Sequence, residues 1–124
     1  MELKHQIKKE QSYTVLLIEN DSLNSGVSVD LKSEIFALSD EGIKNLIMDI
    51  SNVKKIDSSG LAAIITANRL WRAKGNFILT GAHDESIKKL IEVGRLDSIF
   101  RILPSINDAI EYILQEQEDA GAKL

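Results

Sequence analysis

The stretch that decides the fold spans residues 45–61 and reads NLIMDISNVKKIDSSGL. Its apolar run at residues 46–50 predicts a buried strand, and the segment closes on Asp57-Ser58-Ser59-Gly60. The next residues, 61–74, predict a helix whose first turns carry almost no polar face. Asp57 lies at the expected N-cap, because its carboxylate can accept from unpaired backbone N–H groups of the first turn. Three residues of this helix are expected to enter the core: Leu61, Ile64 and Ile65.

Outward from this stretch, strand and helix patterns alternate along the chain. The predicted strands are residues 2–9 (a weak edge strand), 13–18, 46–50, 77–80 and 99–103, and the predicted helices begin near Val27, Leu61, Asp84 and Ser105. We therefore expect one α/β domain over residues 1–115, with a four- to five-stranded mixed sheet and about four helices packed mainly on one side. Residues 116–124 are polar and are expected to form a frayed tail.

Composition and charge argue against several classes of function. The 15 Lys and Arg against 19 Asp and Glu give a net charge of -4, which disfavours nucleic-acid binding, since that depends on clustered cations. The chain has no cysteine and two histidines, so neither a disulfide, a metal centre nor another cofactor is expected. No apolar run approaches the ~20 residues that cross a bilayer, and residues 1–10 lack the apolar core of a signal peptide. We expect a cytoplasmic protein that does not insert into a membrane.

The segment Asp57-Ser58-Ser59-Gly60 has two interpretations. Taken alone it is typical of a helix N-cap, and the tetrapeptide by itself favours that interpretation. It also suits a modification site, because a phosphate on Ser58 would lie near the unpaired N–H groups and the positive end of the helix dipole. Such a phosphate would add about -1.5 to -2 charges beside Asp57. The fold would tolerate this charge, whereas a partner docked against the helix end could be expelled.

The context of this segment resembles the STAS family, the sulphate-transporter and anti-sigma-factor-antagonist domain, over about residues 15–113. The resemblance lies in the order of elements, in residues 45–61, and in GNFILTG at residues 75–81. It implies a protein-binding switch and not an enzyme. In bacterial antagonists, the serine directly after the Asp is phosphorylated by the anti-sigma factor, which is a serine kinase, and a PP2C-type phosphatase is a further partner. That serine is Ser58 here, with Ser59 as the fallback. The implied partner-binding residues are Asn24, Asp57, Ser58, Ser59, Gly60 and Leu61.

The chain departs from the antagonist pattern after its second predicted strand. Antagonists usually carry a Gly-Glu-Leu-Asp-like segment there, whereas this chain has Asp21-Ser22-Leu23-Asn24. Asn24 therefore stands where an acid is expected, although an Asn can still cap the following helix. The Thr that often comes next is replaced by Val27. This departure leaves open a divergent kinase partner or the loss of the switch.

The sequence can be compared with three alternatives to the switch. A receiver domain would need two helices and a strand between Asp21 and Asp49, where only one helix fits. An enzyme could use Ser58 as nucleophile with His83 as base, but the glycine two residues before the serine in a nucleophile elbow is replaced by Ile56. A third alternative, within the same family, stays open: a scaffold that is never phosphorylated or a regulatory subunit of a transporter.

Overall fold

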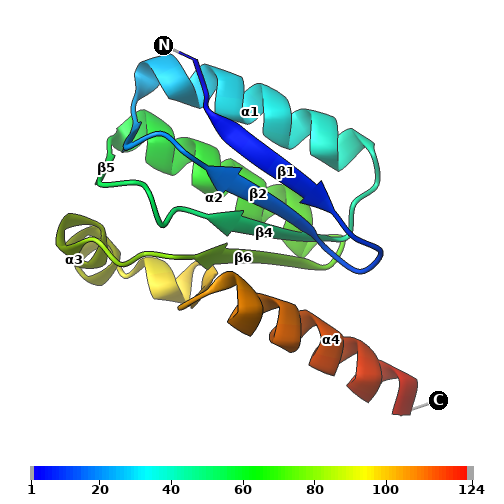
Figure 1. Cartoon of the computed structure of the whole chain (residues 1–124). Helices are drawn as coiled ribbons and strands as arrows, with labels where there is room; N and C mark the ends of the chain where they lie inside the picture. The colour runs from blue at the N-terminus through cyan, green and yellow to red at the C-terminus, as the bar shows by residue number, and fades with distance from the viewer. Residues whose placement is uncertain (1, 123–124) are drawn as a thin grey trace.

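A mixed five-stranded sheet organises the structure, a computed structural model that describes residues 2–122 (Figure 1). Its strands are β1 (His5–Lys9), β2 (Thr14–Ile18), β4 (Asn45–Asp49), β6 (Asn76–Thr80) and β7 (Arg101–Leu103). They lie in the order β1-β2-β4-β6-β7. The edge strand β1 pairs antiparallel with β2, and the other neighbours are parallel. The predicted mixed sheet and its weak N-terminal edge strand are confirmed.

Four helices cover the sheet unequally. They are α1 (Ser25–Asp40), α2 (Ser58–Arg72), α3 (Glu85–Gly94) and α4 (Ile106–Ala122), with a 3-10 turn at Leu96–Ser98 before β7. Because β2, β4 and β6 follow one another in the same direction across the sheet, right-handed crossovers place α1 and α2 on one face. The apolar side of α3 joins that core, while α4 packs on the opposite face. The prediction that helices pack mainly on one side is confirmed.

The central strand β4 is apolar over three consecutive residues, 46–48. Leu46 and Met48 point into the larger core with α1 and α2, whereas Ile47 points the other way, toward Ala109 and Ile113 of α4. All five residues of β4 are buried. A strand covered on both faces has no solvent side, so it reads as a continuous apolar run and not as an alternation.

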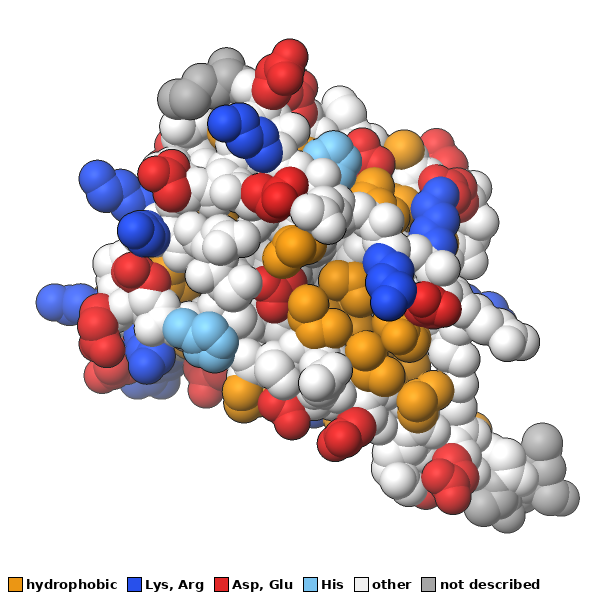
Figure 2. All heavy atoms as spheres, in the orientation of Figure 1, with side chains coloured by type: hydrophobic (Ala, Val, Ile, Leu, Met, Phe, Trp, Pro, Cys, Tyr) orange, Lys and Arg blue, Asp and Glu red, His pale blue; other side chains and the backbone are white. Residues whose placement is uncertain are grey.

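Part of the second sheet face stays open. α4 contacts β4, β6 and β7, and beside it Tyr13 and Leu17 of the β1–β2 half are half-buried. A hollow of about 310 Å³ lies there, bounded on the α4 side by Ile106 and Ile110. Figure 2 shows hydrophobic side chains gathered on this face of the molecule. The main core therefore lies between the sheet and α1–α3.

Two expectations about the helices need correction. α4 continues to Ala122, so residues 116–122 are helical where a frayed tail was predicted, and residues 123–124 lie outside the described part of the chain. One hydrogen bond connects this part of α4 to β6: Asn76 Nδ2 donates to Glu116 Oε1 at 2.7 Å. In α2, Ile64 is buried, but Leu61 and Ile65 pack against the core only half-buried. The buried residues of α2 are Gly60, Ala63, Ile64, Ala67, Asn68 and Trp71.

Replacement of Ile64 tests this packing. Ile64 is 1% exposed, so Ile64→Ala should leave a cavity and lower the free energy of unfolding by roughly 2–5 kcal/mol, measured by urea denaturation. Val29→Ala is the control, because Val29 on α1 is 67% exposed and its truncation should change stability by no more than about 0.5 kcal/mol. Equal, small losses for both variants would mean that α2 does not bury this face.

Candidate functional site

A very short parallel pair brings two distant loops together. β3 (Ser22–Leu23) pairs with β5 (Lys55–Ile56), and the backbone N–H of Asp57 donates to the Leu23 carbonyl at 3.1 Å. α1 begins directly after β3, and α2 begins directly after Asp57. The starts of α1 and α2 therefore lie next to each other at one edge of the molecule, on the left in Figure 1.

Gly60 is required by the closeness of this approach. A Cβ atom at position 60 would lie 2.3 Å from the Leu23 carbonyl oxygen and 2.7 Å from the Leu23 Cβ. Both neighbours belong to a buried residue paired in β3, so they cannot move aside as a flexible side chain would. Only glycine lets the first turn of α2 lie against β3, which gives the Gly of the Asp-Ser-Ser-Gly segment a steric cause.

Asp57 caps α2 as the sequence predicted. Its backbone is extended (φ -91°, ψ -177°), and its carboxylate accepts from the backbone N–H groups of Ser59 and Gly60 at 3.0 Å each. The Ser59 hydroxyl, followed by the Gly60 N–H, holds the pKa of Asp57 below its ordinary value, with further N–H groups from Ser59 and from Ser25 at the start of α1. The cap of α2 is therefore a carboxylate anion that lies next to the start of α1.

The two serines of this turn differ in what their hydroxyls do. The Ser59 hydroxyl donates to Asp57, and its side chain is half-buried. Ser58 is the first residue of α2 and is exposed. Within residues 2–122 its hydroxyl has no hydrogen-bond partner. One serine thus belongs to the cap, and the other offers its hydroxyl to solvent.

Asn24 caps the neighbouring helix. Its side-chain oxygen accepts from Gly26 N–H at 3.0 Å and from Val27 N–H at 3.2 Å, which confirms that an Asn serves here as N-cap. Because this cap is an uncharged amide, one carboxylate and not two serves as cap at the paired helix starts. The structure brings together all the residues implied as partner-binding: Asn24, Asp57, Ser58, Ser59, Gly60 and Leu61.

The catalytic alternatives gain no support from the geometry. His83 follows β6 and lines a different hollow, of about 320 Å³, with Asp49 and Ser51. The Asp49 carboxylate has a structural role. It accepts from the Thr80 hydroxyl at 2.8 Å, which links β4 to β6, and from the N–H and hydroxyl of Ser51. A single helix, α1, separates β2 from β4, unlike the receiver arrangement. Among the described residues no group of three or more His, Asp or Glu side chains could hold a metal ion.

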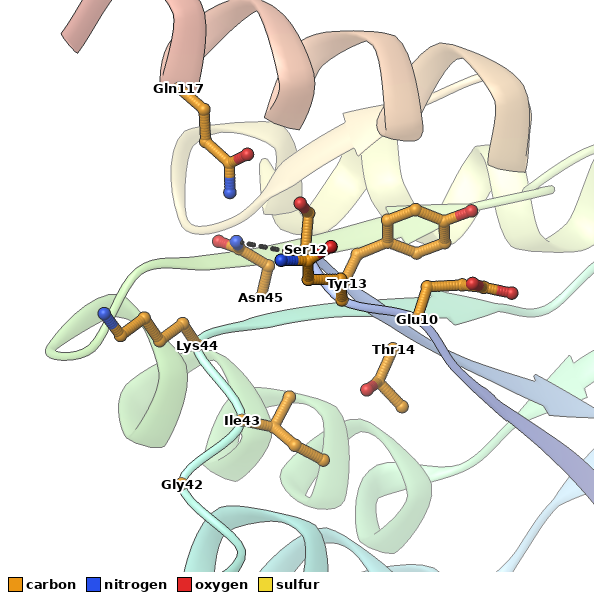
Figure 3. Close-up of a pocket in the computed structure, with 10 residues that line it drawn as sticks. Glu10, Ser12, Tyr13, Thr14, Gly42, Ile43, Lys44, Asn45 and Gln117 are labelled. Carbon is orange, nitrogen blue, oxygen red and sulfur yellow. Dashed lines mark hydrogen bonds between the residues drawn. The ribbon is translucent and has the colours of Figure 1, made fainter. Parts of the chain in front are cut away.

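A further hollow lies at the opposite end of the sheet from Ser58. Its volume is about 470 Å³, and its walls come from residues 10–14, residues 42–45 and Gln117. Two of the lining residues are hydrogen-bonded, because Asn45 Nδ2 donates to the Ser12 carbonyl at 2.8 Å. Figure 3 shows Glu10 and Lys44 pointing away from each other, so the hollow presents no paired acid and base.

No helix within residues 2–122 is long and apolar enough to cross a membrane.

Comparison with known proteins identifies the fold and its relatives. Residues 5–109 match the family model described as the STAS domain. A Thermotoga neapolitana protein, named as a provisional anti-sigma factor antagonist and homolog of TM1081, is 25% identical over 100 residues, which are 80% of this chain and 88% of that protein. An anti-sigma factor antagonist from Mycobacterium paratuberculosis has a similar structure, with a TM-score of 0.81 at 18% identity over 90% of this chain and 93% of that one. The phosphorylated form of the Bacillus cell fate determinant SpoIIAA gives a TM-score of 0.68 at 17% identity over 89% and 99%.

The charge on the α2 cap can be tested through the pH dependence of stability. The folded state holds the pKa of Asp57 below 3.8, so ionised Asp57 stabilises the fold above that pH, and the effect is lost as the pH falls through the lower, folded-state pKa. Asp57→Asn should therefore unfold at a lower urea concentration than the wild type at neutral pH, with the difference shrinking below pH 3.8. Glu111→Gln, an exposed charge on α4, should show no such convergence. A constant difference at all pH values would contradict the charged cap.

Proposed function

This chain belongs to the STAS domain family, and we propose that it is an anti-sigma factor antagonist whose unphosphorylated form sequesters an anti-sigma factor kinase in the cytoplasm. In this proposal the kinase phosphorylates Ser58 and thereby releases itself, and a PP2C-type phosphatase restores the binding form. The observation that carries the proposal is the exposed Ser58 hydroxyl, which has no partner in the described chain and stands at the surface formed by two helix starts.

The choice of Ser58 over Ser59 has a chemical reason. A hydroxyl that accepts a phosphoryl group must present its oxygen to the kinase and give up its proton. The Ser59 proton is donated to Asp57, and phosphorylation there would place a dianion against the capping carboxylate. Modification of Ser58 leaves the cap of α2 intact, so the fold can survive the reaction unchanged.

The electrostatics of the turn support a switch of binding and not of folding. A phosphate on Ser58 would lie close to the unpaired N–H groups at the start of α2, where anions are stabilised. The same phosphate would add about -1.5 to -2 charges beside ionised Asp57. A partner seated flush against this surface would have to bury that charge without a counter-charge, which is costly.

Asn24 adjusts this balance at the neighbouring helix start. An acid at position 24 would repel a phosphate on Ser58, whereas the amide of Asn24 does not. The phosphorylated form of this chain should therefore experience less electrostatic repulsion than a chain with carboxylate caps on both helices. A kinase that acts on it has to recognise an amide at this place, and we propose a divergent anti-sigma factor kinase as the partner.

The first test is phosphorylation. Incubation with ATP and the anti-sigma factor kinase from the same organism should add one phosphate, located on Ser58 by mass spectrometry. Ser58→Ala should abolish the reaction, while Ser59→Ala, the matched control, should still accept phosphate. Phosphate found on Ser59 alone, or on neither serine with a kinase that turns over ATP, would refute the assignment.

The second test is affinity, measured by calorimetry against the same anti-sigma factor. Phosphorylation of Ser58 should weaken binding at least tenfold, which is ~1.4 kcal/mol. Ser58→Asp should reproduce part of this loss because it carries less charge, and Ser58→Ala should bind like the wild type. Equal affinities for all four forms would make Ser58 a helix residue only and would favour a scaffold that is never phosphorylated.

A further inference from the structure

An apolar groove lies beside the Ser58 turn, between β5 and α3. Its volume is about 430 Å³. Besides Ser86, the groove is lined by Lys55, Ile56, Ile87, Lys89, Leu90 and Val93. Four of these six side chains are aliphatic, and the two lysines are positively charged.

The fold itself does not need the outer part of this groove. Ile87 is buried and anchors α3 to the core, but Val93, two turns further along, is 75% exposed. Of the large hydrophobic side chains exposed in the described chain it is the most exposed. Leu90 between them is half-buried. The apolar row on α3 therefore continues past the point where the domain covers it.

The groove and the Ser58 turn form one continuous surface. Ile56 of the groove directly precedes Asp57, and β5 is fixed by its pairing with β3. α3 is fixed to the same segment, because the Ser86 hydroxyl donates to the Lys54 carbonyl. A protein that covers Ser58 can thus reach Val93 without a break in contact.

Of the four lysines around the groove, one makes an ion pair within the described chain. Lys88 Nζ lies 4.0 Å from the Glu85 carboxylate. Lys54 interacts with Asp84, whose pKa is lowered by the Ser86 hydroxyl first, then by the Ser86 N–H and, more weakly, by this lysine. Lys54, Lys55 and Lys89 make no ion pair within residues 2–122. Of these three, Lys55 and Lys89 line the apolar groove.

From this arrangement we infer that the groove between β5 and α3 is the anchoring site of the anti-sigma factor, and that it receives an apolar side chain flanked by carboxylates. The inference rests on the proposed function and adds the chemistry of the partner segment. Apolar contact with Leu90 and Val93 supplies affinity, and carboxylates facing Lys55 and Lys89 orient the segment and speed its approach. Although the chain carries a net charge of -4, both charged side chains that line the groove are cationic.

The experiment compares two matched substitutions by calorimetry against the anti-sigma factor. Val93→Asp places a charge in the groove, and Val29→Asp places the same charge on α1, at a side chain that is 67% exposed. Val93→Asp should weaken binding at least tenfold, and Val29→Asp less than twofold. In the kinase assay, Val93→Asp should raise the KM for phosphorylation of Ser58 more than it lowers kcat, because the groove holds the partner without touching the transferred phosphoryl group.

A charge-reversal variant tests the chemistry of the partner segment. Lys55→Glu with Lys89→Glu should weaken binding and remove most of its dependence on salt; tighter binding would overturn the acidic partner. Equal affinities for Val93→Asp and Val29→Asp would overturn the groove while leaving Ser58 as the switch. Absence of any binding by the wild type would instead overturn the proposed function, and this inference with it.

Discussion

The contact between β3 and the start of α2 is the constraint on which the site depends. The Leu23 carbonyl accepts from Asp57 N–H, and the Cα of Gly60 lies so close to the same residue that no side chain fits between them. This contact fixes where α2 begins, and the start of α2 in turn fixes the direction of Ser58. The contact involves backbone atoms of Leu23, and a single methyl group at position 60 would disrupt it.

The same contact decides the charge of the surface. Two helix starts brought together present two sets of unpaired N–H groups, which attract negative charge. Asp57 meets part of that demand, because its carboxylate accepts from the N–H groups of Ser59 and Gly60. Asn24 caps α1 without a charge, so the surface retains capacity for an additional anion. Under the proposed function, a phosphate on Ser58 would be compatible with the folded chain and would exclude a tightly docked partner.

The sequence predicts the parts of the fold that leave a periodic signal. The apolar run of β4, the alternation of β1 and the helical spacing in α1 all appear where expected. The β3–β5 pair was missed because two residues on each strand carry no periodicity, although it positions the whole site. The polar composition after Gln115 hid the last turns of α4, where helix continues without burial. The difference between Ser58 and Ser59 was likewise beyond the sequence, since it depends on which hydroxyl reaches Asp57.

Topology explains why the features of the site share one edge. The strands β2, β4 and β6 are parallel, so the connections that follow them, which lead to α1, α2 and α3, all emerge at their carboxyl ends. Asn24, Ser58 and Ser86 each lie at the start of one of these helices. The hollow near Lys44 lies at the amino ends, where the preceding helices return to the sheet. Under the proposed function, substitutions of exposed side chains in these connections would alter partner recognition and leave the buried strands in place. Asn24 is an example: it caps α1 through its side-chain oxygen, and as an amide it would present no charge to a partner docked there.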